Sequence, residues 1–509
     1  MKEGRIVRNV LFNLLRAAVL LPLELILIPF VLHRIGVVGF GIWALLRIFI
    51  SYGNIFDFGV SVVLEKYTAE YTDSQNHNSL NRLINTSFLF YLAIALILFF
   101  GVFLLENWIA GSFFKEGWNA VEGLSFILLF SAVILGINLL FSLFTSLLNG
   151  IQRIDLTNTI SAVSALLNFV GIVLVLSLGF GLKGIVVING MVVLVTGLLS
   201  LGMALKKLRR IRLNPLGPFL KFRELTSIIS YGASVQTTRL SSAIHLHLDK
   251  FFLSYFLGLQ YVTFYEIASR LVERLRILPQ MLIQPMMVAV SELNAQGRES
   301  EINRIYVETL RYMVLLSLPF FVFIPFFINP LMKLWLGDSD PLTNRAFYVL
   351  IIAHFLNLLS GPGFLLFLGI GLPKYGALCS LVGGLFHVVL GYLFIITLGY
   401  NGTLLATFIS IVLPSAGFIL IFHRIRKISL KEYLFPLIIR PAIIALCAVF
   451  LTLITIQEFV GNDLKGLILS FLLFILLYGV GGWTVLGKED RLKIKTFLRC
   501  IPYLTWRSP

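Results

Sequence analysis

Arginine side chains occur inside long apolar segments of this sequence, where a charge is costly. The four that stand out are Arg16, Arg47, Arg239 and Arg270. An ionisable group at membrane depth usually faces an aqueous cavity. The guanidinium group is a planar fork of donors that holds phosphate through two parallel hydrogen bonds. These four residues therefore predict a site for an anionic ligand that carries phosphate.

Other polar residues recur at helical spacing near these arginines. On segment 260–290, for example, Glu266 and Gln280 fall with Arg270 within an arc of about 80°. Segments 9–32, 39–64 and 225–254 carry similar stripes. Four stripes together favour a water-filled cavity over isolated ion pairs such as Glu266 with Arg270. The predicted polar lining comprises Asn13, Glu24, Ser51, Asn54, Asp57, Ser234, Thr238, His245, Asp249, Glu266, Glu273 and Gln280.

The sequence predicts no catalytic group, no metal site and no cofactor. The three cysteines, Cys379, Cys447 and Cys500, have no metal-binding or redox spacing. The run 482–488 resembles the start of a phosphate-binding loop, but Glu489 stands where that motif needs Ser or Thr. Without nucleotide binding, any pumping by this chain would have to draw on a coupling ion, H⁺ or Na⁺, or on the membrane potential alone.

Composition identifies the environment of these residues as lipid. Hydrophobic residues make up 58% of the chain and charged residues 13%, with a mean hydropathy of +0.92. A soluble protein carries about 25% charged residues. The net charge of +16 lies mainly in particular loops, which indicates membrane topology rather than nucleic-acid binding.

The hydropathy pattern predicts an all-α integral membrane protein with fourteen transmembrane helices. Each apolar segment is close to the ~20 residues that span a bilayer. The segments are 9–32, 39–64, 85–105, 121–148, 157–179, 184–205, 225–254, 260–290, 307–329, 343–369, 375–398, 402–422, 434–456 and 465–487.

Lys and Arg are concentrated in alternate loops and at both ends of the chain. The densest runs lie at 206–223 and 488–499, whereas the opposite side holds scattered cations such as Arg34, Lys183 and Lys250, the last at the end of segment 225–254. Because cytoplasmic loops carry the excess of positive residues, both termini are predicted to be cytoplasmic, in a multi-pass protein of the cell (inner) membrane. The first apolar run is long enough to span and is read as a retained helix rather than a signal peptide.

Two stretches of the chain resemble each other and indicate an internal repeat. The stretches 35–47 and 257–270 each contain a glycine, an aromatic residue seven positions later and a closing arginine. A repeat of six helices predicts two lobes related by a parallel pseudo-twofold axis. The predicted division is an N-terminal lobe at 1–205, a cytoplasmic linker at 206–224, a C-terminal lobe at 225–430, and two extra helices with a basic tail at 431–509.

Short motifs over about residues 5–430 resemble the polysaccharide-repeat-unit (O-antigen type) flippases of the multidrug/oligosaccharidyl-lipid/polysaccharide exporter superfamily. The motifs are Asn13, Arg16, Phe40-Gly41-Ile42-Trp43, Asp57-Phe58-Gly59, Asn149-Gly150-Ile151-Gln152-Arg153, Leu248-Asp249-Lys250 and the segment 265–270.

This resemblance implies two six-helix lobes and alternating access. It also implies export of undecaprenyl-pyrophosphate-linked oligosaccharide to the outer leaflet, for O-antigen, capsule or exopolysaccharide synthesis. In the related lipid II flippases, arginines on helices 1, 2 and 8 bind the pyrophosphate, and Arg16, Arg47 and Arg270 occupy matching helices here. The first helix lacks a dense cationic set, which disfavours lipid II itself as the substrate.

Two other functions stay open at this point. A cation-coupled drug antiporter of the same superfamily would need an acidic cavity with few cations, which the in-helix arginines disfavour. A membrane-bound polysaccharide polymerase or ligase would normally have a long outer loop with clustered acids. The expected protein is a monomer and not an enzyme. Its expected partners are the lipid-linked oligosaccharide, membrane lipids and the polysaccharide polymerase machinery, with no nucleic acid.

Overall fold

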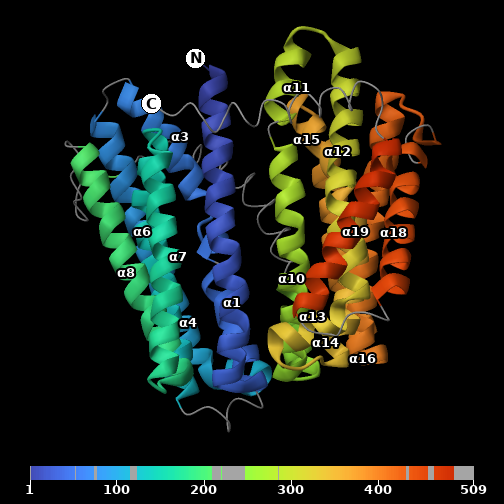
Figure 1. Ribbon diagram of the computed structural model, residues 1–509. Helices are drawn as coiled ribbons and strands as arrows, with labels where there is room; N and C mark the ends of the chain where they lie inside the picture. The colour runs from blue at the N-terminus through green and yellow to red at the C-terminus, as the bar shows by residue number, and fades with distance from the viewer. Residues whose placement is uncertain are drawn as a thin grey trace, which may run out of the picture. The chain divides into compact units, whose positions relative to one another are not determined.

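The computed structural model describes residues 2–51, 53–73, 77–114, 123–208, 219, 247–284, 286–431, 435–456 and 464–485 (Figure 1). Within these ranges, side chains are described from Pro22 onward, except at residues 51, 53, 54, 73, 278, 282, 288, 456, 484 and 485. Every regular element in the described ranges is a helix. The all-α class predicted from the sequence is confirmed for this part of the chain.

Contacts between residues divide the chain into two compact units. Unit 1 comprises Met1–Ile267 and Gly384–Ala406, and unit 2 comprises Ala268–Gly383 and Thr407–Pro509. The boundaries fall inside two long helices, α10 (Leu259–Ile283) and α16 (Pro373–Arg426). These units are not the lobes predicted from the repeat, which remain a prediction.

Unit 1 contains the N-terminal helices together with parts of α10 and α16. Helix α6 packs against α4 and α8, while α7 packs against α8 and α1 (Figure 1). The elements are α1 (Lys2–Ser51), α2 (Gly53–Phe56), α3 (Val60–Asp73), α4 (His77–Phe113), α6 (Leu124–Gly150), α7 (Ile154–Ser177), α8 (Gly181–Lys207) and a helical segment at 247–256.

Unit 2 contains the rest of α10 and α16 and the C-terminal helices. Helix α12 packs against α18, which packs in turn against α19, and α11 packs against α15. The elements are α11 (Met286–Ala295), α12 (Glu299–Phe326), α13 (Ile328–Leu336), α14 (Pro341–Leu358), α15 (Gly361–Gly369), η1 (Phe435–Ile439), α18 (Arg440–Ile456) and α19 (Leu464–Val485).

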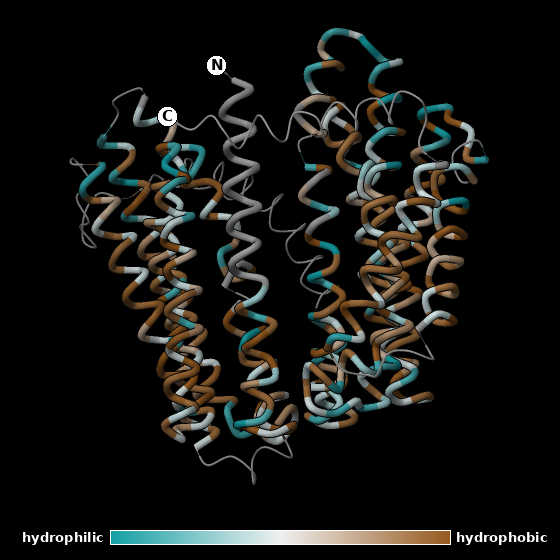
Figure 2. The backbone as a smooth tube through the Cα atoms, in the orientation of Figure 1, coloured by the Kyte–Doolittle hydropathy of each residue, from teal (hydrophilic) through white to brown (hydrophobic). Residues whose placement is uncertain are grey.

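The helices are long and apolar enough to cross a membrane. Ten helical segments within the described residues meet that criterion. Helix α6, for example, has 27 residues, which at 1.5 Å per residue gives about 40 Å against a hydrocarbon core of about 30 Å. Figure 2 shows hydrophobic residues along the middle of the helices and hydrophilic residues mainly toward their ends. The chain is therefore a multi-pass membrane protein.

Two glycines interrupt helices that otherwise run on. Gly36 in α1 has φ 73° and Gly399 in α16 has φ 58°. Positive φ is easy for glycine and costly for other residues, so each position marks a sharp change of direction. Each separates two predicted spans: 9–32 from 39–64, and 375–398 from 402–422. At each position the structure has a single non-helical glycine where the sequence predicted a loop between two spans.

Three of the predicted spans are interrupted within their length. Segment 39–64 is interrupted at Asp57-Phe58-Gly59, where Phe58 has φ 49° and Gly59 φ 78°. Segment 343–369 is interrupted at Leu359-Ser360, between α14 and α15. Segment 260–290 is divided into α10 and α11, which lie on either side of Pro285. A proline at that point removes a backbone donor and clashes with the preceding turn.

Candidate functional site

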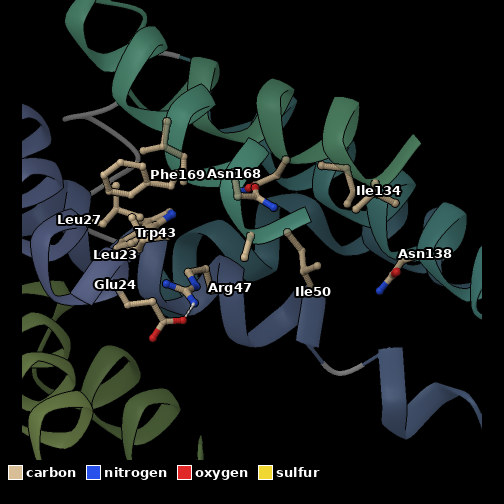
Figure 3. A pocket seen from close by; sticks show the side chains of 14 residues that line it. Leu23, Glu24, Leu27, Trp43, Arg47, Ile50, Ile134, Asn138, Asn168 and Phe169 are labelled. Carbon is tan, nitrogen blue, oxygen red and sulfur yellow. Dashed lines mark ion pairs between the residues drawn. The ribbon is translucent and has the colours of Figure 1, made fainter. Parts of the chain in front are cut away.

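A pocket of about 360 Å³ lies inside unit 1. Its walls come from α1, α6, α7 and α8, and most of its lining is apolar (Figure 3). Five polar side chains interrupt that lining: Glu24, Arg47, Asn138, Asn168 and Asn189. Two of them, Glu24 and Arg47, belong to the set predicted from the sequence.

The break at Gly36 explains how Glu24 meets Arg47. Both residues belong to α1, at nearly equal distances of about 17 Å along the helix from Gly36. The Arg47 Nη2 atom lies 4.0 Å from Glu24 Oε1, and each side chain is about one third exposed, at 35% and 34%. Figure 3 shows the two charged groups facing each other. The ion pair is therefore long, and both side chains remain accessible from the pocket.

Trp43 lies beneath the Arg47 guanidinium group. The Cζ atom of Arg47 is 5.0 Å from the centroid of the indole ring, a cation–π distance. Trp43 is fully buried and packs edge-on against Phe40, with ring centroids 5.2 Å apart. One face of the guanidinium group is thus supported by a rigid aromatic stack. This orients its donors for a planar acceptor such as phosphate.

Three asparagines, one from each of α6, α7 and α8, also line the pocket. The Nδ2 atom of Asn168 donates to the Ser164 carbonyl oxygen at 3.1 Å, while its Oδ1 atom is buried and accepts no hydrogen bond within the described structure. Among the described residues, Asn138 and Asn189 make no hydrogen bond. Composition and spacing did not single out these amides, because an isolated Asn in an apolar helix gives no periodic signal.

A second group of charged side chains is buried elsewhere in unit 1. The Asp249 carboxylate is 2.7 Å from Nε2 of His387 and accepts a hydrogen bond from the Tyr265 hydroxyl at 2.6 Å. Next to Asp249 in sequence, Lys250 forms an ion pair with Glu266, with Nζ 2.5 Å from Oε2. All five side chains are buried. The side chain of Lys250 is enclosed by protein, and its predicted place at the outer end of segment 225–254 stays a prediction.

Unit 2 contains a polar chain centred on Arg276. Its guanidinium group lies 2.8 Å from Nδ1 of His354 and donates to the Asn357 amide oxygen at 2.9 Å. The Asn357 amide donates in turn to the Ser415 hydroxyl at 2.9 Å. Because the guanidinium group can only donate, His354 accepts through Nδ1 as a neutral imidazole. Sequence reasoning did not single out His354 and His387, because they are lone histidines in apolar segments.

Asp57 is placed in a structural role by its contacts. Its carboxylate accepts hydrogen bonds from the Ser61 backbone at 3.0 Å, the Ser61 hydroxyl at 2.6 Å and the Tyr91 hydroxyl. It is buried and lies just before α3. The three donors satisfy this carboxylate and tie the start of α3 to α4.

The other predicted site residues fall into two groups. In unit 2, Arg270 is buried, Glu273 accepts from the Ser269 hydroxyl at 3.2 Å, and Gln280 is half-buried. The remaining predicted residues cannot be located as side chains: Asn13, Arg16, Ser51 and Asn54 have described backbone only, and Ser234, Thr238, Arg239 and His245 lie outside the described residues. Their predicted roles stay predictions.

Comparison with known proteins identifies relatives of this chain. A family model described as "Polysaccharide biosynthesis protein" matches residues 33–339. A curated relative, "Putative O-antigen transporter" of Shigella flexneri, is 22% identical over 419 residues, which are 81% of this chain and 96% of the relative.

Solved structures share the fold at low sequence identity. The inward closed structure of the lipid II flippase MurJ has a TM-score of 0.64 and 16% identity, with 92% of this chain and 97% of that chain covered. An inward-facing MATE family transporter of the MOP superfamily has a TM-score of 0.63 and 15% identity, with 80% and 94% covered. These likenesses show that the chain has the fold of MOP superfamily transporters.

Proposed function

Since the chain belongs to the polysaccharide biosynthesis protein family, a membership that confirms the resemblance seen in its motifs, we propose that it is a flippase. Its substrate is undecaprenyl-pyrophosphate-linked oligosaccharide, which it moves by alternating access from the cytoplasmic to the outer leaflet of the cell membrane. The product serves the synthesis of a surface polysaccharide. The protein acts as a carrier rather than an enzyme, beside the polysaccharide polymerase machinery.

The observation that carries this proposal is the setting of Arg47. A cation inside apolar helices is expensive unless a ligand or an aqueous cavity compensates for it. Arg47 lines a pocket, is about one third exposed and has its ring-facing side supported by Trp43. Its Nη2 atom lies 4.0 Å from Glu24 Oε1, the limit of an ion pair. The group is thus placed to form a bidentate bond to a pyrophosphate in the pocket.

Fourteen crossings are part of the same proposal. The ten apolar segments include one that spans Gly36 and one that spans Gly399, and each counts as two crossings. The segment ending at 256 and the pair α10 with α11 add two more. An even number places both termini on the same side, which the basic runs identify as the cytoplasm.

Outward movement of an anionic headgroup needs little further energy in a cell that is negative inside. The membrane potential favours it by about 2.3 kcal/mol per charge per 100 mV. The protein's task is to lower the desolvation barrier, and Arg47 contributes by replacing water around the phosphates. Coupling to H⁺ or Na⁺ is compatible with this scheme but is not required by it.

Replacement of Arg47 tests the proposal. In a strain that lacks its own flippase, Arg47→Ala should abolish surface polysaccharide while membrane abundance is unchanged, and Arg47→Lys should restore part of the activity because it keeps the charge but loses the fork. Arg304→Ala is the matched control, because Arg304 is exposed on α12, forms an ion pair with Glu308 one turn away and does not line the pocket. Full polysaccharide in Arg47→Ala contradicts the role given to this residue.

A second variant separates ligand binding from local charge balance. If Arg47 serves only to neutralise Glu24, then Glu24→Gln combined with Arg47→Gln should recover transport, because both charges are removed. If Arg47 binds pyrophosphate, the double variant should stay inactive.

A further inference from the structure

The asparagines of the unit 1 pocket have hydrogen-bonding capacity that the protein does not use. Asn138, Asn168 and Asn189 come from α6, α7 and α8 and line one cavity. In membrane helices such residues usually hydrogen-bond across to a neighbouring helix. Within the described structure, the only hydrogen bond from this trio is the one Asn168 donates within its own helix. Three amides are therefore directed at one space without bonding the surrounding helices.

The buried oxygen of Asn168 makes the strongest case. It has no hydrogen-bond partner among the described residues. A buried acceptor left unpaired costs about 1–3 kcal/mol, so native structures rarely keep one without a reason. Asn168 also lines the pocket, so a turn of its amide would bring this oxygen to a ligand hydroxyl or a water there.

The chemistry of the three amides selects a neutral ligand rich in hydroxyl groups. Each amide has two donors and an acceptor on one plane, and adjacent hydroxyls on a sugar ring offer both functions in return. The nearby guanidinium group of Arg47 disfavours a metal cation, and the amides carry no charge to attract a second phosphate. Apolar side chains such as Phe169 and Ile172 complete the lining and suit the C–H face of a sugar ring.

The layout of the pocket also matches the order of groups in the proposed substrate. Arg47 and Glu24 lie on α1, and the asparagines lie on the helices beside them (Figure 3). A volume of about 360 Å³ is at the small end of ligand sites. We propose that Arg47 and the three asparagines form a subsite for the first sugar of the lipid-linked oligosaccharide, next to its pyrophosphate. This inference rests on the proposed flippase function.

Binding of two kinds of probe to the purified full-length protein tests this subsite. One probe is a polyprenyl pyrophosphate, and the others are the same lipid carrying a single glucose, galactose, N-acetylglucosamine or N-acetylgalactosamine. At least one sugar-bearing probe should bind the unaltered protein about tenfold more tightly than the sugarless lipid. Asn168→Leu should lower that ratio by about three- to tenfold, the effect of one or two lost hydrogen bonds, while affinity for the sugarless lipid stays constant.

Matched variants keep the test independent of folding. Asn138 is exposed, so Asn138→Ala alters little packing and should also reduce the ratio. Thr196→Val on α8 is the control, because the hydrogen bonds of Thr196 within the described structure go to carbonyl groups of its own helix. An unchanged ratio in both asparagine variants, as for a pocket that holds only water, overturns the subsite. Equal binding of all probes overturns it too. If the unaltered protein binds neither kind of probe, the flippase proposal itself fails.

Discussion

The Nε2 atom of His387 lies 2.7 Å from Oδ1 of Asp249, and both side chains are buried, at 0% and 1% exposure. Tyr265 donates to the other oxygen of the same carboxylate. Two donors from α10 and α16 therefore converge on an acidic group of the 247–256 helical segment. In a lipid environment no water is available to replace either of them, so the cluster ties three helices of unit 1 together.

Loss of His387 should destabilise the protein. His387→Ala leaves the buried Asp249 carboxylate with one donor fewer, at a cost of about 3 kcal/mol. We expect a clear drop in the unfolding temperature of the detergent-purified protein. Thr397→Val on the same helix is the control, because Thr397 is exposed and, among the residues described, bonds to backbone carbonyls one turn away. Equal stability of the two variants would argue against a structural role for the histidine.

The ion pair of Lys250 and Glu266 should show strong coupling between the two residues. Glu266→Gln alone leaves the ammonium group buried without a counter-charge and should cost about 3–5 kcal/mol. Adding Lys250→Met removes that charge and should recover most of the loss. The four proteins of this cycle can be compared by thermal unfolding. Additive losses in the double variant would show that the pair does not interact as described.

Close packing of α8 against α6 should tolerate no side chain at Gly197. A Cβ atom there would overlap the ring of Phe141, whereas a Cβ atom at Gly202, five residues along the same helix, would meet nothing within 4 Å. Gly197→Ala should therefore destabilise by about 1–3 kcal/mol. Gly202→Ala should be neutral or should stabilise by up to about 1 kcal/mol, because alanine favours the helix. The reverse ranking in thermal unfolding would mean that the two helices are further apart.

Membrane topology can be tested with reporters at two places in unit 2, before α14 and after α16. A reporter fused after Asp338, in the exposed turn before α14, should be external, and one fused after Lys427, at the end of α16, should be cytoplasmic. Fusions at exposed turns leave the preceding helices complete. The same location for both reporters would rule out an odd number of crossings between them, and with it the fourteen-helix scheme.

Sequence patterns predicted the helices well because hydrophobic segments of membrane length are unambiguous. They also placed Glu24 and Arg47 together at one site, although the reason, the reversal at Gly36, is a backbone property that periodicity does not reveal. The ion partner of Glu266 was beyond such reasoning. Spacing suggested Arg270 one turn away, but the structure pairs Glu266 with Lys250 from another segment. Ion-pair partners that are distant in sequence depend on how the helices pack. The polar stripe of a single helix does not predict that packing.

Asp249 and His387 are far apart along the chain, so Asp249 is synthesised well before its partner. The two residues are 138 positions apart. At a translation rate of about 5–20 residues per second, Asp249 emerges from the ribosome roughly 7–28 s before its imidazole partner. Asp and Lys each disfavour insertion by about 2.5–3.5 kcal/mol at the centre of a span. The nascent segment that carries Asp249 and Lys250 should therefore stay with the insertion machinery, and enter lipid only once α10 and α16 have been synthesised.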